Sequence, residues 1–137
     1  MIEYNCDIGK FINDYSINNN GKDYSMIIDL SYKYKVKYDS VCRKWIGRLK
    51  KFLNKKDVFV SGIFVNEYDS NFSSLHNHIL MYSDKDYYLV EGYVFNFWKN
   101  IGSCNIEKYN SNENYSYYIS KHLNKNVNNS WDFIENI

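Results

Sequence analysis

Two strand-like segments separated by a short polar stretch constrain the fold of this chain most strongly. Val58–Val65 and Leu75–Tyr82 are rich in β-branched, aromatic and aliphatic residues, and Asp69–Ser74 between them contains turn-forming residues. This pattern predicts an antiparallel β-hairpin. Segments with helical periodicity flank the hairpin on both sides, so the chain is expected to mix helices with an antiparallel sheet.

The segments around the hairpin complete an ordered series of strands and helices. Before it, Met26–Leu30 is a short apolar run that continues into the alternating stretch Tyr32–Tyr38, which predicts one strand. A helix beginning at Asp39 or Ser40 then has apolar residues at helical spacing: Val41, Cys42, Trp45, Ile46, Leu49, Phe52 and Leu53. After the hairpin, the pattern predicts a helix from Ser83 or Asp84 to a point before Gly102, a strand over Ile106–Tyr109 and a helix after Ser111.

The order β-α-β-β-α-β-α predicts an α+β, ferredoxin-like split β-α-β fold. Helices are expected on one face of the antiparallel sheet, with an added C-terminal helix. The 137 residues suit a single domain over 1–137. Residues 1–24 are polar and are expected to form an irregular N-terminal extension. Residues 126–137 are expected to form a tail anchored by Trp131, Phe133 and Ile134.

The composition argues against a membrane or secreted setting. No apolar run approaches the roughly 20 residues that a spanning helix needs. The first residues carry no signal-peptide pattern. The three cysteines, Cys6, Cys42 and Cys104, are far apart, which argues against a disulfide framework and for a reducing compartment.

Positive charge is concentrated in one part of the chain. Residues 33–56 contain ten basic residues and one acid, although the whole chain has a net charge of only +1. A basic block in an otherwise acidic domain predicts a surface that faces a polyanion. The alternative is a solvated, lysine-rich helix face. The candidate contacts are Lys33, Lys35, Lys37, Arg43, Lys44 and Arg48.

His76 and His78 form the most informative pair of polar residues. Side chains two apart on a strand point to the same face, so both imidazoles are expected to emerge side by side. Glu67 ends the preceding strand, and the hairpin can fold its carboxylate back beside them. Two imidazoles and a carboxylate can hold a divalent metal with open positions for a substrate oxygen. The alternative is two hydrogen-bonded or exposed histidines and a solvated strand-end acid.

A Tyr-x-x-Lys pattern places Tyr118 and Lys121 one turn apart on the predicted C-terminal helix. The pattern also occurs at Tyr32, Tyr34 and Tyr82, because tyrosine and lysine are abundant in this chain. Tyr118 is distinguished by its position downstream of the two-histidine strand. A phenol with a pKa near 10 needs help from a cation or base to act as a nucleophile, and Lys121 can provide it or bind a phosphate. By spacing alone, Tyr115 and Tyr117 remain alternatives.

Together these motifs resemble the HUH endonuclease superfamily, in particular the single-tyrosine replication initiators (Reps) of rolling-circle viruses and plasmids and of small archaeal viruses. The resemblance spans roughly residues 25–125. It rests on Glu67 ahead of the His76–His78 strand and on Tyr118-Ile119-Ser120-Lys121-His122-Leu123-Asn124-Lys125. Asn77 departs from the pattern, because a hydrophobic residue is usual there. Its amide is expected to need a hydrogen-bond partner under the helices. His122 stands where a tyrosine is commoner.

The resemblance implies a metal-dependent nickase. Mn²⁺ or Mg²⁺ held by Glu67, His76 and His78 would polarise a phosphate of single-stranded DNA at a replication origin or hairpin. Tyr118 would attack, leaving a 5′-phosphotyrosine link, and Lys121 would stabilise charge. The resemblance also implies a viral or plasmid protein in the host cytoplasm, acting as a homodimer. No Walker A sequence is present, so a helicase or other replication protein would be supplied separately.

Three alternatives remain, one of which is a structural viral protein whose two histidines occur together by chance. A single-tyrosine HUH transposase would share the fold and chemistry but would cut transposon ends. A non-catalytic module that binds single-stranded nucleic acid would use the sheet without a metal or a covalent intermediate.

Overall fold

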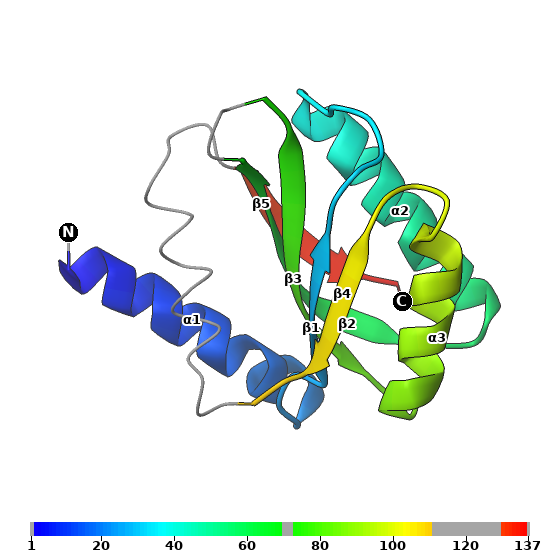
Figure 1. The fold of residues 1–137 in the computed structure, drawn as a ribbon. Helices are drawn as coiled ribbons and strands as arrows, with labels where there is room; N and C mark the ends of the chain where they lie inside the picture. The colour runs from blue at the N-terminus through cyan, green and yellow to red at the C-terminus, as the bar shows by residue number, and fades with distance from the viewer. Residues whose placement is uncertain (1, 70–72, 111–129, 137) are drawn as a thin grey trace.

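The computed structural model describes residues 2–69, 73–110 and 130–136, and in that part of the chain three helices pack on a five-stranded antiparallel sheet (Figure 1). The strand order is β4-β1-β3-β2-β5, which confirms the predicted ferredoxin-like α+β class. The elements are α1 (Ile2–Asn20), β1 (Met26–Leu30), α2 (Asp39–Lys55), β2 (Val60–Tyr68), β3 (Leu75–Ser83), α3 (Tyr87–Trp98), β4 (Cys104–Lys108) and β5 (Ser130–Glu135).

The main core lies between the sheet and the two helices α2 and α3. Every second residue of a strand faces the same side, and on this side Met26, Ile28 and Leu30 of β1 are buried. The predicted apolar spacing of α2 places Ile46, Leu49 and Leu53 against them. Trp98 at the end of α3 is completely buried, and its indole Nε1 donates to the Ser31 carbonyl at 2.8 Å.

The N-terminal segment is a helix, so the expectation of an irregular extension is wrong for Ile2–Asn20. Its sequence is rich in asparagine and contains two glycine or asparagine turn signals, and its apolar residues are not spaced as one clear helical stripe. Ile12 and Tyr15 nevertheless pack on the second face of the sheet, against residues that include Ile27 and Leu80. The sheet is therefore covered by α2 and α3 on one face and partly by α1 on the other, as Figure 1 shows.

The predicted continuation of β1 through Tyr32–Tyr38 is also wrong. The backbone leaves the sheet after Leu30, and the backbone N–H of Lys33 donates to the Ile101 carbonyl at 2.7 Å. Val36 is buried, whereas Tyr34 and Tyr38 are 80% and 72% exposed. The alternation of residue types therefore belongs to a connection between β1 and α2 that buries single side chains such as Val36, and not to a strand.

The contact between the segment after β1 and the segment after α3 also explains why residue 102 is a glycine. Gly102 was expected just beyond the end of a helix. A Cβ atom at Gly102 would lie 1.9 Å from the Ser31 carbonyl oxygen. Glycine is required here by the close approach of two backbones.

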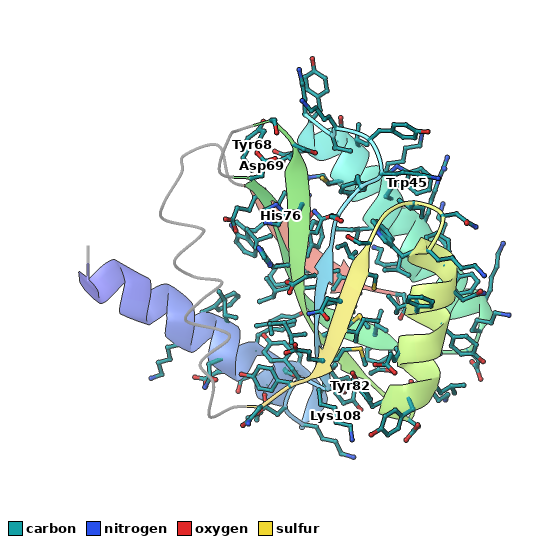
Figure 2. All side chains as sticks on the ribbon, viewed as in Figure 1. Trp45, Tyr68, Asp69, His76, Tyr82 and Lys108 are labelled. Carbon is teal, nitrogen blue, oxygen red and sulfur yellow. The ribbon has the colours of Figure 1, made fainter. Side chains whose placement is uncertain are left out.

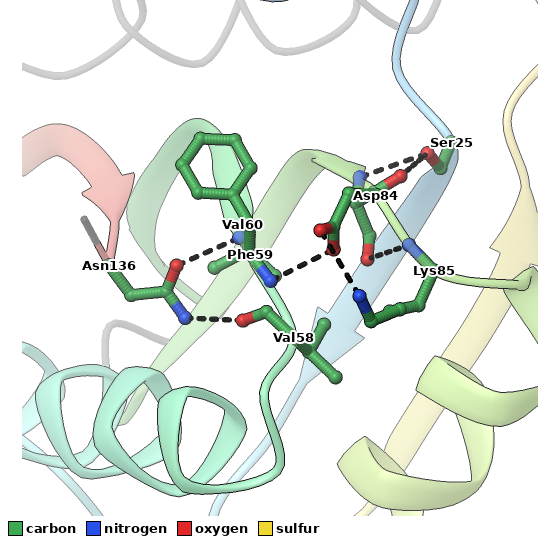
Figure 3. Close-up of polar contacts among 8 residues, drawn as sticks. Ser25, Val58, Phe59, Val60, Asp84, Lys85 and Asn136 are labelled. Carbon is green, nitrogen blue, oxygen red and sulfur yellow. Dashed lines mark hydrogen bonds and ion pairs between the residues drawn. The ribbon is translucent and has the colours of Figure 1, made fainter.

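The expected C-terminal tail contains β5, an edge strand that pairs with β2. Ile134 is buried as an anchor, but Trp131 and Phe133 are about 40% exposed. The Asn136 side chain holds the end of the strand: its Oδ1 accepts from the Val60 amide and its Nδ2 donates to the Val58 carbonyl, both at 2.8 Å (Figure 3).

Candidate metal centre and nucleic-acid surface

Three side chains gather at one end of the sheet, on the face away from α2 and α3. Glu67 of β2 pairs directly with His76 of β3, and His78 follows two residues later on the same face. One ligand atom from each of the three residues lies within 4.8 Å of the other two. Figure 2 shows His76 beside β3 on this side of the sheet. The structure thus brings together Glu67, His76 and His78, the three residues that the sequence predicted as metal ligands. They are called the metal group below, and the end of the sheet where they lie is the metal end.

His78 is held by a carboxylate on each ring nitrogen. Its Nε2 lies 3.0 Å from Glu67 Oε2, and its Nδ1 lies 2.6 Å from Asp29 Oδ1. Asp29 lies directly opposite His78 on β1. Metal-binding histidines almost always use their second ring nitrogen in this way, which fixes the ring and its tautomer.

Asp29 is a site residue that sequence reasoning did not identify. The available signal was an acid in the middle of the apolar run Met26–Leu30. A carboxylate at such a position needs a partner or solvent, but only the pairing of β1 with β3 shows that the partner is His78.

The two histidines differ in their protonation. Burial disfavours the imidazolium of His78, but the hydrogen bonds and charges of Asp29 and Glu67 outweigh it and raise the pKa of His78 to about 9. Burial, followed by repulsion from His78, lowers the pKa of His76. In the metal-free protein at neutral pH, a proton on His78 therefore balances the carboxylates. A cation bound at Nε2 would displace it, since ligating imidazoles are neutral.

A buried hydrogen-bond chain lies on the opposite face, directly behind the metal group. Asn66 and Asn77 are paired across β2 and β3, and both are completely buried. Tyr32 Oη donates to Asn77 Oδ1 at 2.6 Å, Asn77 Nδ2 donates to Asn66 Oδ1, and Asn66 Nδ2 donates to Asp39 Oδ1 at 3.3 Å. The expected partner of the Asn77 amide is thus present. These hydrogen bonds connect the paired residues of the hairpin to the first turn of α2.

The predicted basic contacts fall into two groups. Lys33, Lys35 and Lys37 are exposed on the connection between β1 and α2. This connection reaches the metal end of the sheet, where Tyr68 Oη donates to the Lys37 carbonyl at 3.0 Å.

The other three basic residues, Arg43, Lys44 and Arg48, lie on α2, which covers the opposite face. Arg43 forms an ion pair with Asp132 and also donates to the Trp131 carbonyl at 3.3 Å. The Arg48 guanidinium lies 4.8 Å from the centre of the Trp45 ring. Both arginines therefore contact protein groups, whereas Lys44 is an exposed side chain.

Tyr118 and Lys121, with the alternatives Tyr115 and Tyr117, lie outside the described residues. So do His122 and the expected C-terminal helix. The segment that carries them joins β4 to β5, which are the two edge strands of the sheet. β5 begins at Ser130 opposite Asn66, one residue from Glu67.

None of the described helices is both long enough and apolar enough to cross a membrane.

Comparison with known proteins assigns the chain to a family. The family model described as "Replication-associated protein", of the ORF2 type, matches residues 25–127, which include β1 through β4, the whole metal group and the segment with Tyr118. Searches of curated proteins and of solved structures gave no match. The match covers well over half of the sequence, so this chain belongs to that replication-associated protein family.

Proposed function

We propose that this protein is a single-tyrosine HUH replication initiator that nicks and rejoins single-stranded DNA at a specific site. The observation that carries the proposal is the grouping of Glu67, His76 and His78 on one sheet face, in a chain of a replication-associated family. That family favours initiation of replication over the cutting of transposon ends.

The donor set fits a divalent cation. Two imidazole nitrogens and one carboxylate oxygen leave coordination positions open for substrate, and such a mixed set suits Mn²⁺ better than Mg²⁺, which prefers oxygen alone. When bound, the cation would act as a Lewis acid on a scissile phosphate. Asp29 supports the arrangement by holding the His78 ring through Nδ1.

Tyr118 supplies the nucleophile in this proposal. Its phenolic oxygen forms a bond to phosphorus while the bond from phosphorus to the 3′ oxygen breaks. The phenol loses its proton, the departing 3′ oxygen gains one, and the 5′ end stays linked to the protein. Attack by a free 3′ hydroxyl reverses these steps and joins the strands. Lys121, three residues after Tyr118 in the sequence, offsets the negative charge that develops.

The exposed lysines at the metal end provide the backbone contacts. Lys33, Lys35 and Lys37 lie on the connection that reaches this end of the sheet, and Tyr34 and Tyr38 beside them are exposed. Ammonium groups attract the phosphates of any sequence, and exposed rings can stack on unpaired bases. Arg43, Lys44 and Arg48 extend this positive charge along α2.

The wider setting follows from the same proposal. The protein acts on an origin or hairpin of a viral or plasmid genome in the host cytoplasm. It pairs with a second copy where two nicks are needed, and it relies on a separate helicase.

A covalent-adduct assay tests the proposal. The protein is incubated with Mn²⁺ and a diverse pool of single-stranded and hairpin DNAs, and adducts are resolved on a denaturing gel and mapped by mass spectrometry. We expect an adduct on Tyr118 that is lost with EDTA and in Tyr118→Phe but kept in the control Tyr82→Phe. An adduct on Tyr115 or Tyr117 would keep the enzyme class and replace the nucleophile. Metal-independent DNA binding without any adduct would instead support a non-catalytic binding module.

A further inference from the structure

Aromatic side chains lie at the β5 edge of the sheet, on the other side of the buried Val65 from the metal group, and three of the four are exposed, while Tyr15 is buried. Val65 of β2 pairs with His78 on one side and with Trp131 of β5 on the other. His78, Val65 and Trp131 therefore lie side by side on three neighbouring strands, and their side chains are on the same face of the sheet. At the usual strand spacing, the two backbones are about 10 Å apart.

Four rings form a continuous aromatic strip, which consists of Trp131, Phe133, Tyr15 and Phe11. The Phe133 ring centre lies 5.4 Å from that of Trp131 and 5.1 Å from that of Tyr15, on which it stacks. Phe11 lies 6.4 Å from Phe133. Trp131, Phe133 and Phe11 are 41%, 40% and 48% exposed, far more than large apolar side chains in a core.

The outer end of the strip opens into a groove between α1 and β5. The groove has a volume of about 480 Å³, within the range of pockets that hold small ligands. Phe11, Tyr15 and Phe133 line its apolar part, and Lys10, Asp14, Asn18 and Asn19 line its polar part. The opposite charges of Lys10 and Asp14 leave the groove neutral. Such a lining suits an uncharged ring with amide-like edges better than a phosphate.

We propose that the aromatic strip binds unpaired bases of the DNA strand whose phosphate lies at the metal group. The proposal rests on the proposed function and adds a place for the bases. Base stacking on aromatic side chains is the usual means of holding single strands without sequence readout. The strip meets this need because its rings lie on the same side of the sheet as the metal group. It begins at Trp131, the β5 residue paired with Val65, and it ends in a neutral groove. A few nucleotides span the distance from His78.

DNA binding without metal tests the strip independently of the chemistry. Anisotropy of a labelled oligothymidylate is measured in EDTA with the full chain and with Trp131→Leu and Phe133→Leu. Stacking on one ring corresponds to roughly 5- to 150-fold in affinity, so each variant should bind more weakly by a factor in that range. Trp131→Phe should recover most of the loss. The matched control is Phe95→Leu, since Phe95 is 57% exposed on α3, the helix on the other face.

The outcomes separate this proposal from the proposed function. If Trp131→Leu and Phe133→Leu bind DNA as Phe95→Leu does, while the wild type still forms the Tyr118 adduct, the strip proposal alone is overturned. If those variants bind DNA normally but change the sedimentation of the protein, the strip is a contact between copies, and the proposal again fails. If the wild type neither binds DNA nor forms an adduct, the proposed function fails as well.

Discussion

The bond between Asp29 and His78 is the residue-scale feature that organises the candidate site. His78 is 7% exposed, and its ring is fixed through Nδ1 by a carboxylate on the neighbouring strand. A ring oriented in advance presents Nε2 toward Glu67 without further ordering. The metal group therefore depends on three strands, although its three ligands come from two.

Removal of the Asp29 carboxylate should weaken metal binding. We expect Asp29→Ala to lower Mn²⁺ affinity by about 10- to 100-fold, the usual effect of losing a carboxylate that orients a metal-binding histidine. Asp29→Asn should lose less, because the amide oxygen can still accept from Nδ1. Calorimetric titration measures both, with Glu107→Gln as the control because Glu107 lies on the same face of β4 opposite Ile27. Equal affinities for Asp29→Ala and Glu107→Gln would refute the positioning role.

The protonation of His78 predicts how the stability of the metal-free protein depends on pH. The folded-state pKa of about 9 exceeds the ordinary value of 6.5, so protonation stabilises the folded state. This contribution is complete below pH 6.5 and is lost as the pH rises through 9. With EDTA present, the midpoint of thermal unfolding should therefore fall over this interval.

Removing a carboxylate partner should make that pH dependence smaller. Glu67→Gln takes away one of the two groups that raise the pKa of His78, so its midpoint should fall less between pH 6.5 and 9. A wild-type midpoint that rises over the interval, or an unchanged pH dependence in Glu67→Gln, would contradict the assignment.

At the scale of elements, the asparagine pair behind the site links the hairpin to α2. Asn77 receives a hydrogen bond from Tyr32 and donates one to Asn66, which in turn bonds Asp39 of α2. The ligands of the metal group alternate along β2 and β3 with this pair, so one register serves both faces. A slip of one residue would turn the histidines into the core.

Asn77→Val tests how much this chain of hydrogen bonds contributes. Valine has the higher strand propensity, but it would leave the buried Asn66 and Tyr32 groups without their partner. We expect a loss of about 1–3 kcal/mol in the free energy of unfolding, measured by urea denaturation. Asn105→Val is the control, because Asn105 is exposed on β4 and its replacement should be neutral or slightly stabilising. Equal effects of the two substitutions would mean that the bonds contribute nothing.

Part of the structure could be predicted from local patterns, and part could not. The hairpin and the buried face of α2 were predictable because strand-forming residue types, a turn between them, and helical spacing can each be recognised within a single segment. α1 was missed because its asparagine-rich sequence is typical of loops, and because the burial of Ile12 and Tyr15 depends on the second face of the sheet. β5 was missed because a short edge strand is defined by its distant partner β2.

The candidate site divides in the same way. His76 and His78 could be identified because side chains two residues apart on one strand lie on the same face. Glu67 could be added because a hairpin places the end of its first strand beside the start of its second. Asp29 could not be assigned, because its relation to His78 depends on which strand lies next to β3.

At the scale of the whole molecule, the two faces of the sheet have different roles. One face holds the main core under α2 and α3, with the asparagine pair at its metal end. The other face carries the metal group and the aromatic strip, and α1 packs on part of it and contributes Phe11 and Tyr15 to the strip. We infer that Glu67, His76 and His78 form one metal centre on this second face.

Calorimetric titration of the metal-free protein with Mn²⁺ tests whether this centre forms. We expect one ion per chain, with binding lost in His76→Ala and in Glu67→Gln and retained in Glu107→Gln. Far-UV circular dichroism of each variant confirms that a loss of binding is not a loss of fold. Mn²⁺ binding that survives in His76→Ala and Glu67→Gln, or a folded wild-type protein that binds no divalent ion, would show that these three residues do not form a metal centre.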